Sequence, residues 1–188
     1  QCRGLGVAMS NHLSNEIRVV SLIPSATEIG DCLGYGQQLV GRSHECDFPS
    51  SVRHLPICTE PKFDPHGTSR EIHERVSELL SSALSVYRVN TEILAQLQPT
   101  HIITQAQCDV CAVSLSDVEK AVAELVSKEN SAHNADEPSG TQQTIQVISL
   151  QPNQLAEVWG DIQRGNMALS GQPQDGRAQA VVGSLLRR

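Results

Sequence analysis

The chain has 188 residues, of which 39% are hydrophobic and 3% aromatic, and its formal net charge is −7 at pH 7. This length supports one sizeable domain, whose core must be built mainly from Val, Ile, Leu and Ala. The acidic balance argues against nucleic acid as a partner, because phosphate binding needs clustered Lys and Arg. No stretch approaches the ~18 apolar residues that a membrane-spanning helix needs.

Residues 1–16 have a mixed composition without a clear pattern and are predicted to be an N-terminal tail. No basic segment followed by an apolar one is visible there, so the sequence shows no signal peptide and the compartment stays unassigned. Residues 17–23 are β-branched and apolar, which predicts a strand buried on both faces. Pro24 is expected to end that strand. Ser25 is expected to cap the next helix, with Glu28 completing a capping box.

The middle of the chain alternates short apolar runs with amphipathic segments. Strands are predicted at residues 39–41 and 101–104, and a helix with one apolar face at 71–80. Asn90 is predicted to cap a helix over residues 91–98, and Ser114 to cap the helix that follows the second strand.

The last third begins with a polar stretch, residues 127–144, which is predicted to be a flexible surface insertion. A strand is expected at 145–150, followed by a helical tract from Asn153 whose apolar stripe includes Leu155 and Ile162. Glycines in residues 171–176 should interrupt that tract before a further helix over 177–188.

The order of these elements predicts an α/β fold, a Rossmann-like lobe with a mainly parallel sheet, because strand–helix–strand units make right-handed crossovers. Ligands of such sheets bind beyond the carboxyl ends of the strands. This places four polar segments along one edge, which we call the rim: residues 24–27, 43–49, 59–64 and 105–113. The predicted lobe covers residues 17–152, and residues 153–188 form a separate helical region.

Cys108 and Cys111 form a C-x-x-C directly before a predicted helix N-terminus, where the helix dipole favours thiolate. Three uses remain open for this motif: a redox dithiol, half of a metal site, or loop cysteines that only shape a ligand-binding segment. The metal site would be completed by His44 and Cys46, since one imidazole and three thiolates suit zinc.

The second polar constellation, residues 43–49, offers an imidazole, a thiol and two carboxylates near a strand end. Two interpretations stay open for it. It could be a solvated loop anchored by Phe48 and Pro49, or a ligand contact through hydrogen bonds or direct coordination by His44. Ser25 is not in a G-x-S-x-G elbow, and no nucleophile–base pair is evident, so we do not predict an enzyme.

Residues 18–28, RVVSLIPSATE, together with residues 40–49, VGRSHECDFP, resemble the N-terminal lobe of the cobalamin-binding proteins of ABC importers. Residues 84–104 and the segment 105–114, QAQCDVCAVS, are similar to the same group, which belongs with siderophore and haem binders in the helical-backbone metal-receptor superfamily. The resemblance covers residues 17–169.

The resemblance implies a periplasmic binding protein with two α/β lobes, joined by a long helix, that hold a corrinoid or other metal chelate between them. Here residues 153–188 would correspond to the connecting helix. The second lobe would be a missing partner, and the membrane subunits of an importer a further one. The lobe alone is then expected to bind its ligand weakly or not at all. The expected ligand contacts are Pro24, Ser25, Ala26, Thr27, His44, Glu45, Cys46, Glu60, Gln105, Gln107 and Cys108.

Overall fold

A four-stranded parallel sheet forms the centre of the molecule. The structure is a computed structural model that describes residues 17–82, 85–107, 112–132, 144–172 and 175–187. The strands lie in the order β2-β1-β5-β6, and each neighbouring pair is parallel. The α/β class with a mainly parallel sheet is therefore confirmed. The strands are β1 (Val19–Ser21), β2 (Leu39–Arg42), β5 (His101–Gln105) and β6 (Gln146–Leu150).

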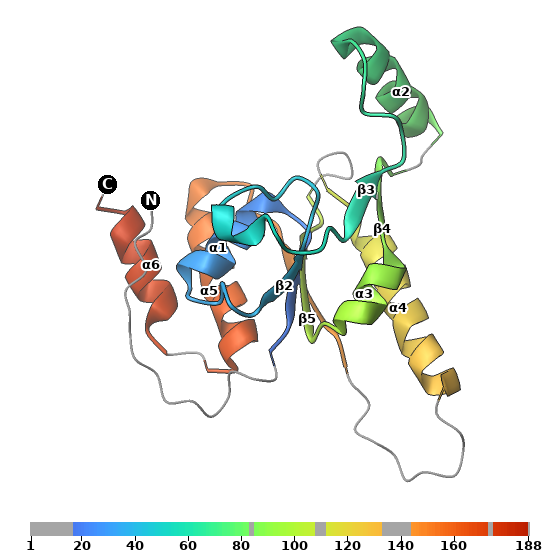
Figure 1. The fold of residues 1–188 in the computed structure, drawn as a ribbon. Coiled ribbons are helices and arrows are strands. Elements are labelled where there is room, and N and C mark those ends of the chain that lie inside the picture. The colour runs from blue at the N-terminus through green and yellow to red at the C-terminus, as the bar shows by residue number, and fades with distance from the viewer. Residues whose placement is uncertain (1–16, 83–84, 108–111, 133–143, 173–174, 188) are drawn as a thin grey trace.

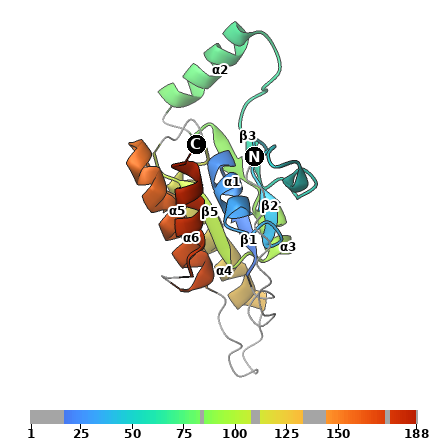
Figure 2. The ribbon, with the colours of Figure 1, turned by 90° about the vertical axis from the view of Figure 1, so that its left-hand side faces the viewer.

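Helices cover both faces of this sheet, which gives three layers (Figure 1). On one side lie α1 (Pro24–Cys32), α5 (Leu155–Ser170) and, outside them, α6 (Arg177–Leu185). On the other lie α3 (Thr91–Leu97) and α4 (Leu115–Ala132). Figure 2, turned by a quarter, shows α1, α5 and α6 together in front of the sheet.

The strands contribute side chains to two hydrophobic clusters, one on each face of the sheet, because successive side chains of a strand point to opposite sides. Val19 and Ile103 pack in the cluster that includes Ile162 of α5. Their chain neighbours, Val20 and Ile102, pack in the cluster of α3 and α4. Burial on both faces explains why adjacent positions are both apolar at the centres of these strands.

A small antiparallel pair, β3 (Thr59–Pro61) and β4 (Tyr87–Val89), lies outside the main sheet. Between them the chain runs out to α2 (Ser69–Ser81), which projects away from the body (Figure 1). We call residues 62–82 the α2 arm. The predicted helix is present, but none of its residues is buried, so it does not cover the sheet as the alternating pattern suggested.

The helix caps agree with the sequence at two positions and differ at a third. Asn90 accepts a hydrogen bond from the Ile93 amide, and the Ser114 hydroxyl accepts one from the Asp117 amide, as predicted. Ser25, in contrast, is not an N-cap: α1 begins at Pro24, its N-cap position is Ile23, and no side chain caps it. Proline starts the helix because its fixed φ suits the first helical position.

The polar stretch predicted as an insertion begins inside a helix, because α4 continues to Ala132. Toward the C-terminus, α5 and α6 occur as expected, with left-handed glycines at Gly171 (φ 64°) and Gly176 (φ 78°) in the interruption between them. Both helices pack against the same core through Leu169 and Ala178. Within the described ranges, no helix has the length and apolarity that crossing a membrane requires.

Candidate functional site

The loops that follow the parallel strands meet at one edge of the sheet, as expected for a ligand site in this class of fold. The chain leaves β1 into the start of α1, β2 into residues 43–49, β5 into Gln107, and β6 into the start of α5. The base of β3 and β4 lies beside the same edge (Figure 1). The described part of the rim is therefore built by segments far apart in the sequence.

A buried polar contact holds α1 against the loop after β2. The Thr27 hydroxyl lies 2.8 Å from Ser21 Oγ and 3.1 Å from Cys46 Sγ. All three side chains are almost fully buried. These groups fix the two rim segments to each other from below, where a ligand on the rim cannot reach them.

The loop after β2 is braced by two arginines through its backbone carbonyls. Arg42 donates to the carbonyls of Ser43 (3.1 Å) and Cys46 (2.9 Å), and Arg53 donates to that of Asp47 (2.7 Å). Phe48 does not anchor this loop, because 52% of its surface is exposed. The guanidinium groups satisfy carbonyls that regular secondary structure would otherwise pair. They hold the loop that one of the two interpretations had anchored by Phe48 and Pro49.

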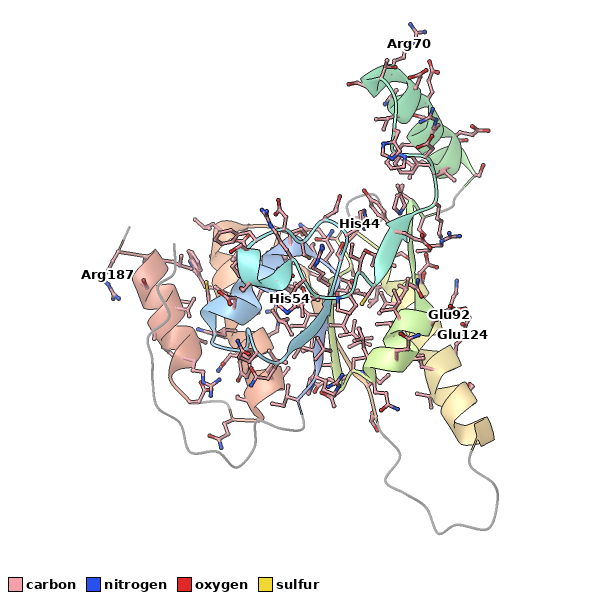
Figure 3. The ribbon with its side chains drawn as sticks, in the orientation of Figure 1. His44, His54, Arg70, Glu92, Glu124 and Arg187 are labelled. Atoms are coloured by element: carbon pink, nitrogen blue, oxygen red, sulfur yellow. The ribbon has the colours of Figure 1, made fainter. Side chains whose placement is uncertain are left out.

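His44 stands at the upper edge of the sheet beside β3 (Figure 3). Its Nδ1 lies 2.8 Å from Thr59 Oγ1, and that hydroxyl also accepts the His44 amide at 3.1 Å. The ring of Tyr87 packs against the imidazole, with centroids 5.0 Å apart. β3 and β4 thus orient His44, and neither Thr59 nor Tyr87 was among the predicted site residues.

Burial lowers the pKa of His44, with the charge of Arg42 acting in the same direction and that of Glu45 opposing it. The imidazole is therefore neutral at pH 7. Since Nδ1 is engaged by Thr59, Nε2 is the ring nitrogen that a bound group could use. A neutral imidazole can accept a hydrogen bond or coordinate a metal.

Two predicted contacts, Glu45 and Glu60, carry charge on the side of the rim next to β4. Glu45 is exposed and accepts a long hydrogen bond, 3.4 Å, from the Tyr87 hydroxyl. Glu60 forms an ion pair with Arg88 at 2.7 Å, directly across the β3–β4 pair. The charge of Arg88 compensates that of Glu60. The other carboxylate, Glu45, directly follows His44 in the sequence.

Gln107 links the loops after β5 and β6. Its side-chain amide donates to the carbonyl of Pro152 at 2.6 Å and lies 3.3 Å from Asn153 Oδ1. Gln105 ends β5 and is half-buried. Cys108 and Cys111 lie outside the described residues.

The remaining predicted ligand contacts fall into two groups, those with an accessible side chain and those with a buried one. Ser25 is exposed and Pro24 half-buried, so both can meet a ligand on the rim. Ala26 and Thr27 are buried beneath them, and Cys46 is also fully buried. Those three side chains shape the rim from below, and only their backbone can face a ligand directly.

Thiol chemistry is disfavoured at the cysteines the structure describes near the rim. Burial raises the pKa of Cys46, although Thr27 and the Ser43 backbone partly oppose this, and burial raises the pKa of Cys58 to about 12. The thiolate is the form that binds metal and attacks disulfides. Across the described part of the chain, no group of three or more His, Cys, Asp or Glu side chains is placed to hold a metal ion.

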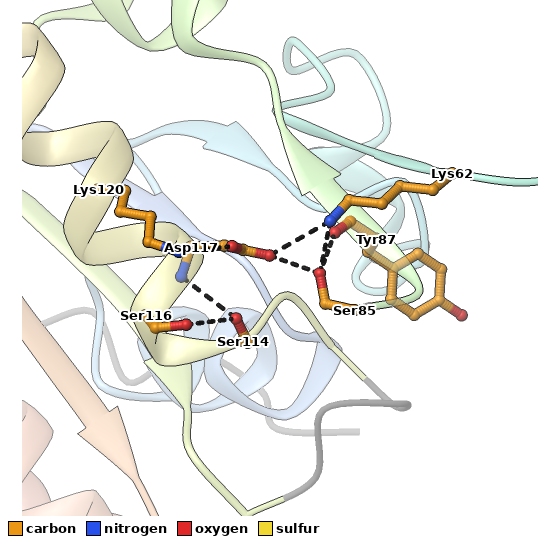
Figure 4. A network of polar contacts seen from close by, with 7 residues as sticks. All are labelled: Lys62, Ser85, Tyr87, Ser114, Ser116, Asp117 and Lys120. Atoms are coloured by element: carbon orange, nitrogen blue, oxygen red, sulfur yellow. Dashed lines mark hydrogen bonds and ion pairs between the residues drawn. The ribbon is translucent and has the colours of Figure 1, made fainter. Parts of the chain in front are cut away.

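The base of the α2 arm is tied to α4 by a polar network that sequence analysis did not identify (Figure 4). Ser85 Oγ lies 2.5 Å from Asp117 Oδ2, and Lys62 Nζ lies 2.6 Å from Ser85 Oγ and 3.4 Å from the same carboxylate oxygen. Lys62 also donates its amide to the Val86 carbonyl at 2.8 Å. The members of this network are scattered along the chain: the pairing of β3 with β4 brings Lys62 to Ser85, and the packing of α4 beside β4 adds Asp117.

No protein-family model matches the sequence, and no curated protein matches it either. Solved structures do match in fold. A periplasmic heme-binding protein of Vibrio cholerae superimposes with a TM-score of 0.51 at 20% identity, over 89% of this chain and 46% of that one. A possible iron-binding, periplasmic solute-binding protein of Staphylococcus epidermidis gives 0.50 at 20% identity, over 89% and 46%.

A periplasmic heme-binding protein from Roseiflexus in its apo form gives a TM-score of 0.50 at 20% identity, over 87% of this chain and 44% of that one. The chain therefore spans about half the length of the structures that it resembles. These neighbours are binding proteins rather than enzymes. At this level of identity the likeness shows the fold, a solute-binding-protein lobe, and leaves the ligand open.

Proposed function

We propose that this chain is one lobe of a binding protein for cobalamin or a related metal chelate, and that it serves uptake or delivery through an ABC importer. The observation that carries the proposal is the placement of His44. Its imidazole is neutral, is oriented by Thr59 and Tyr87, and stands at the carboxyl edge of a parallel sheet. A second lobe facing the rim would complete the enclosure, since ligand sites of this kind bury most of the ligand surface.

In this proposal His44 Nε2 meets the metal of the chelate or a polar group beside it. Thr59 would then act as the outer partner that fixes the orientation of the ring, as carboxylates and hydroxyls do for metal-bound histidines elsewhere. Ser25 and Gln107 supply polar contacts from α1 and from the loop after β5. The buried Ser21–Thr27–Cys46 contact holds α1 against the loop after β2, which carries His44.

The alternative, a zinc or thiol redox site in a non-transport protein, has less support. It needs the Cys46 thiolate, whereas burial and the raised pKa keep that group protonated. A chelate that brings its own metal makes no such demand on the protein. We therefore retain the chelate-binding function.

Titration of the chain with hemin, cyanocobalamin and dicyanocobinamide, followed by absorption spectroscopy, tests the proposal. We expect at least one chelate to bind, and to bind weakly, because this lobe supplies only one wall of the site. His44→Gln should weaken that binding by about tenfold, which corresponds to ~1.4 kcal/mol. His54→Gln is the matched control, because His54 is exposed on the segment between β2 and β3 (Figure 3). The absence of any spectral change with all three chelates would refute the proposed function.

A spectral readout also separates two roles of His44. If Nε2 coordinates the metal, the wild-type complex should show a shifted absorption band that His44→Gln abolishes. If His44 only donates or accepts a hydrogen bond, affinity should fall while the band position stays the same.

A further inference from the structure

The connection between β3 and β4 is far longer than the pairing of these strands requires. β3 ends at Pro61 and β4 begins at Tyr87, whereas the loop of a β-hairpin commonly has about 2–5 residues. The extra chain forms the α2 arm, which stands away from the body in both views (Figures 1 and 2). None of the residues of α2 is buried, so the helix adds nothing to the core. A segment of this size that does not stabilise its own domain is available to bind something else.

The α2 arm is nevertheless held in a fixed shape by its own contacts. Thr68 and Glu71 form a capping box at the start of α2. Arg75 donates to the carbonyls of Asp64 at 2.8 Å and His66 at 2.6 Å, which fastens the incoming segment to the helix. An isolated helix of this length is only marginally stable in water, and these contacts offset that weakness. The helix is therefore formed before any partner arrives, which lowers the entropic cost of binding.

Charged side chains occupy only one half of the surface of α2. Residues four apart form rows along a helix. Two adjacent rows of α2, which we call its uncharged face, contain no Lys, Arg, Asp or Glu: Ile72–Val76–Leu80 and Ser69–His73–Ser77–Ser81. The other two rows carry all its charged residues, which are Arg70, Glu71, Glu74, Arg75 and Glu78. Since Leu80 is 42% exposed and Ile72 and Val76 are only half-buried, the uncharged face is open to a partner.

The two rows of the uncharged face differ in height. Isoleucine, valine and leucine form a high row, and three serines with one histidine form a low row beside it. Helices pack with the row of one in the groove of the other. When two copies of α2 meet about a two-fold axis, each high row lies over the low row of the other copy. The uncharged face therefore fits a second copy of itself, and Val76, the middle of the high row, faces Val76 of that copy.

We infer that the uncharged face is a self-association surface, on which α2 of a second copy of this chain packs antiparallel. The absence of charge on both rows argues against a partner recognised by ion pairs, because charge usually determines partner choice. Antiparallel packing also sets the two helix dipoles in opposite directions. α2 has 13 residues and is thus ~20 Å long, so the contact buries less than the ~1,600 Å² of a standard interface. The dimer is therefore weak, and the inference does not depend on the ligand of the rim.

Sedimentation velocity over a series of protein concentrations tests this inference. We expect monomer at low concentration and a dimer fraction that rises with concentration. Val76→Glu should weaken the association by more than about tenfold, because it would bury a charge between the two helices. Arg70→Glu is the matched control: it adds the same carboxylate to the charged half, where the Arg70 side chain is 88% exposed, and should leave the dimer unchanged. Circular dichroism checks that both variants keep the helix content of the wild type.

Oxidative cross-linking of Val76→Cys tests the two-fold geometry directly. This variant should form a disulfide-linked dimer, whereas Glu74→Cys, on the charged half, should not exceed the wild type, whose six native cysteines give the background. A chain that stays monomeric at every concentration, with no cross-link above that background, would overturn the inference, and the uncharged face would then serve a different protein. A dimer that persists in Val76→Glu would overturn it too, because association would then use another surface.

Discussion

Thr27 Oγ1 lies 3.1 Å from Cys46 Sγ, and this contact joins α1 to the loop after β2 beneath the rim. The same hydroxyl lies 2.8 Å from Ser21 Oγ, so one side chain serves two buried partners. Removing a partner from a buried polar group costs about 1–3 kcal/mol, because the group left behind stays dehydrated. The contact therefore determines how firmly the two rim segments are held together.

Thr27→Val should lower the free energy of unfolding by about 1–3 kcal/mol, since valine keeps the shape of threonine and removes only the hydroxyl. Urea denaturation followed by circular dichroism measures the change. Thr91→Val, at the half-buried first position of α3, is a suitable control with the same chemistry. If Thr27→Val were as stable as wild type, the buried contact would contribute nothing to holding the rim.

Stability should also depend on pH through His44. Its pKa is lowered in the folded protein, mainly by burial, so below about pH 6.5 the unfolded chain binds the proton more readily than the folded one. The free energy of unfolding should fall as the pH drops below about 6.5, and it should level off once the pH is below the folded pKa. Denaturation series between pH 7.5 and pH 4.5, values chosen to bracket that range, measure the slope.

His101 contributes with the same sign, because burial lowers its pKa as well. His44→Asn should therefore reduce the slope without abolishing it. The titration of each imidazole can be followed separately by NMR of the ring protons. A folded pKa of His44 at or above about 6.5 would contradict the prediction.

The two buried cysteines near the rim should resist modification. Burial raises the pKa of Cys58 to about 12, so at pH 8 almost none of it is thiolate. Cys46 is fully buried and its pKa is raised as well. Iodoacetamide should label both residues only after denaturant is added, whereas the half-buried Cys32 should react earlier. Peptide mass spectrometry gives the extent at each position, and fast native labelling of Cys46 would revive the thiolate alternative.

The α2 arm should loosen when the Asp117 charge is removed. Burial raises the pKa of this carboxyl, but the hydrogen bond from Ser85 and the charge of Lys62 outweigh it and lower the pKa. Asp117→Asn should therefore weaken the contacts at the base of the arm by about 1 kcal/mol, the range of a partly exposed ion pair. Amide exchange of Lys62, whose N–H bonds to Val86, should accelerate about fivefold.

Lys120→Ala is the control for this prediction. Lys120 approaches the other oxygen of Asp117 only to 3.9 Å, and its side chain is 73% exposed. It should leave the exchange rate of Lys62 unchanged. Unchanged exchange in Asp117→Asn as well would show that backbone pairing alone closes the arm.

The main sheet could be predicted from the sequence because its strands are buried on both faces. Val19 and Val20 point in opposite directions, yet both meet apolar neighbours, and this requirement leaves a continuous apolar run that is easy to recognise. The rim followed from the same reasoning, because parallel strands bring their carboxyl ends to one edge. His44, the imidazole on the rim, was likewise among the predicted contacts.

What the sequence could not reveal depends on contacts between distant segments. Thr59 and Tyr87 reach His44 only because β3 pairs with β4, and each of those strands is too short to leave a periodic pattern. Helical periodicity identified α2 but gives no information on whether its apolar face has a partner. Leu155 has the spacing of the packed stripe, yet it is the first residue of α5 and is 69% exposed.

Side chains pack closely around Gly41 of β2 and leave no room for a Cβ atom. A Cβ at this position would come within 2.7 Å of both Cys58 Sγ and Leu97 Cδ1, and within 3.2 Å of Val20 Cγ2. Cys58 and Val20 are fully buried, so they have no solvent space to move into. Gly41→Ala should therefore lower the free energy of unfolding by about 1–3 kcal/mol, the usual cost of overpacking.

Gly165→Ala is the control for Gly41→Ala, and we expect it to change the free energy of unfolding in the opposite direction. Gly165 lies inside α5, and nothing approaches within 4 Å of the Cβ that alanine would add. Alanine there should raise the free energy of unfolding by about 0.5–1 kcal/mol, because glycine loses more backbone freedom in a helix. If Gly41→Ala were stabilising as well, the close packing of Cys58 and Leu97 against β2 would be wrong, and with it the position of Cys58, which directly precedes β3.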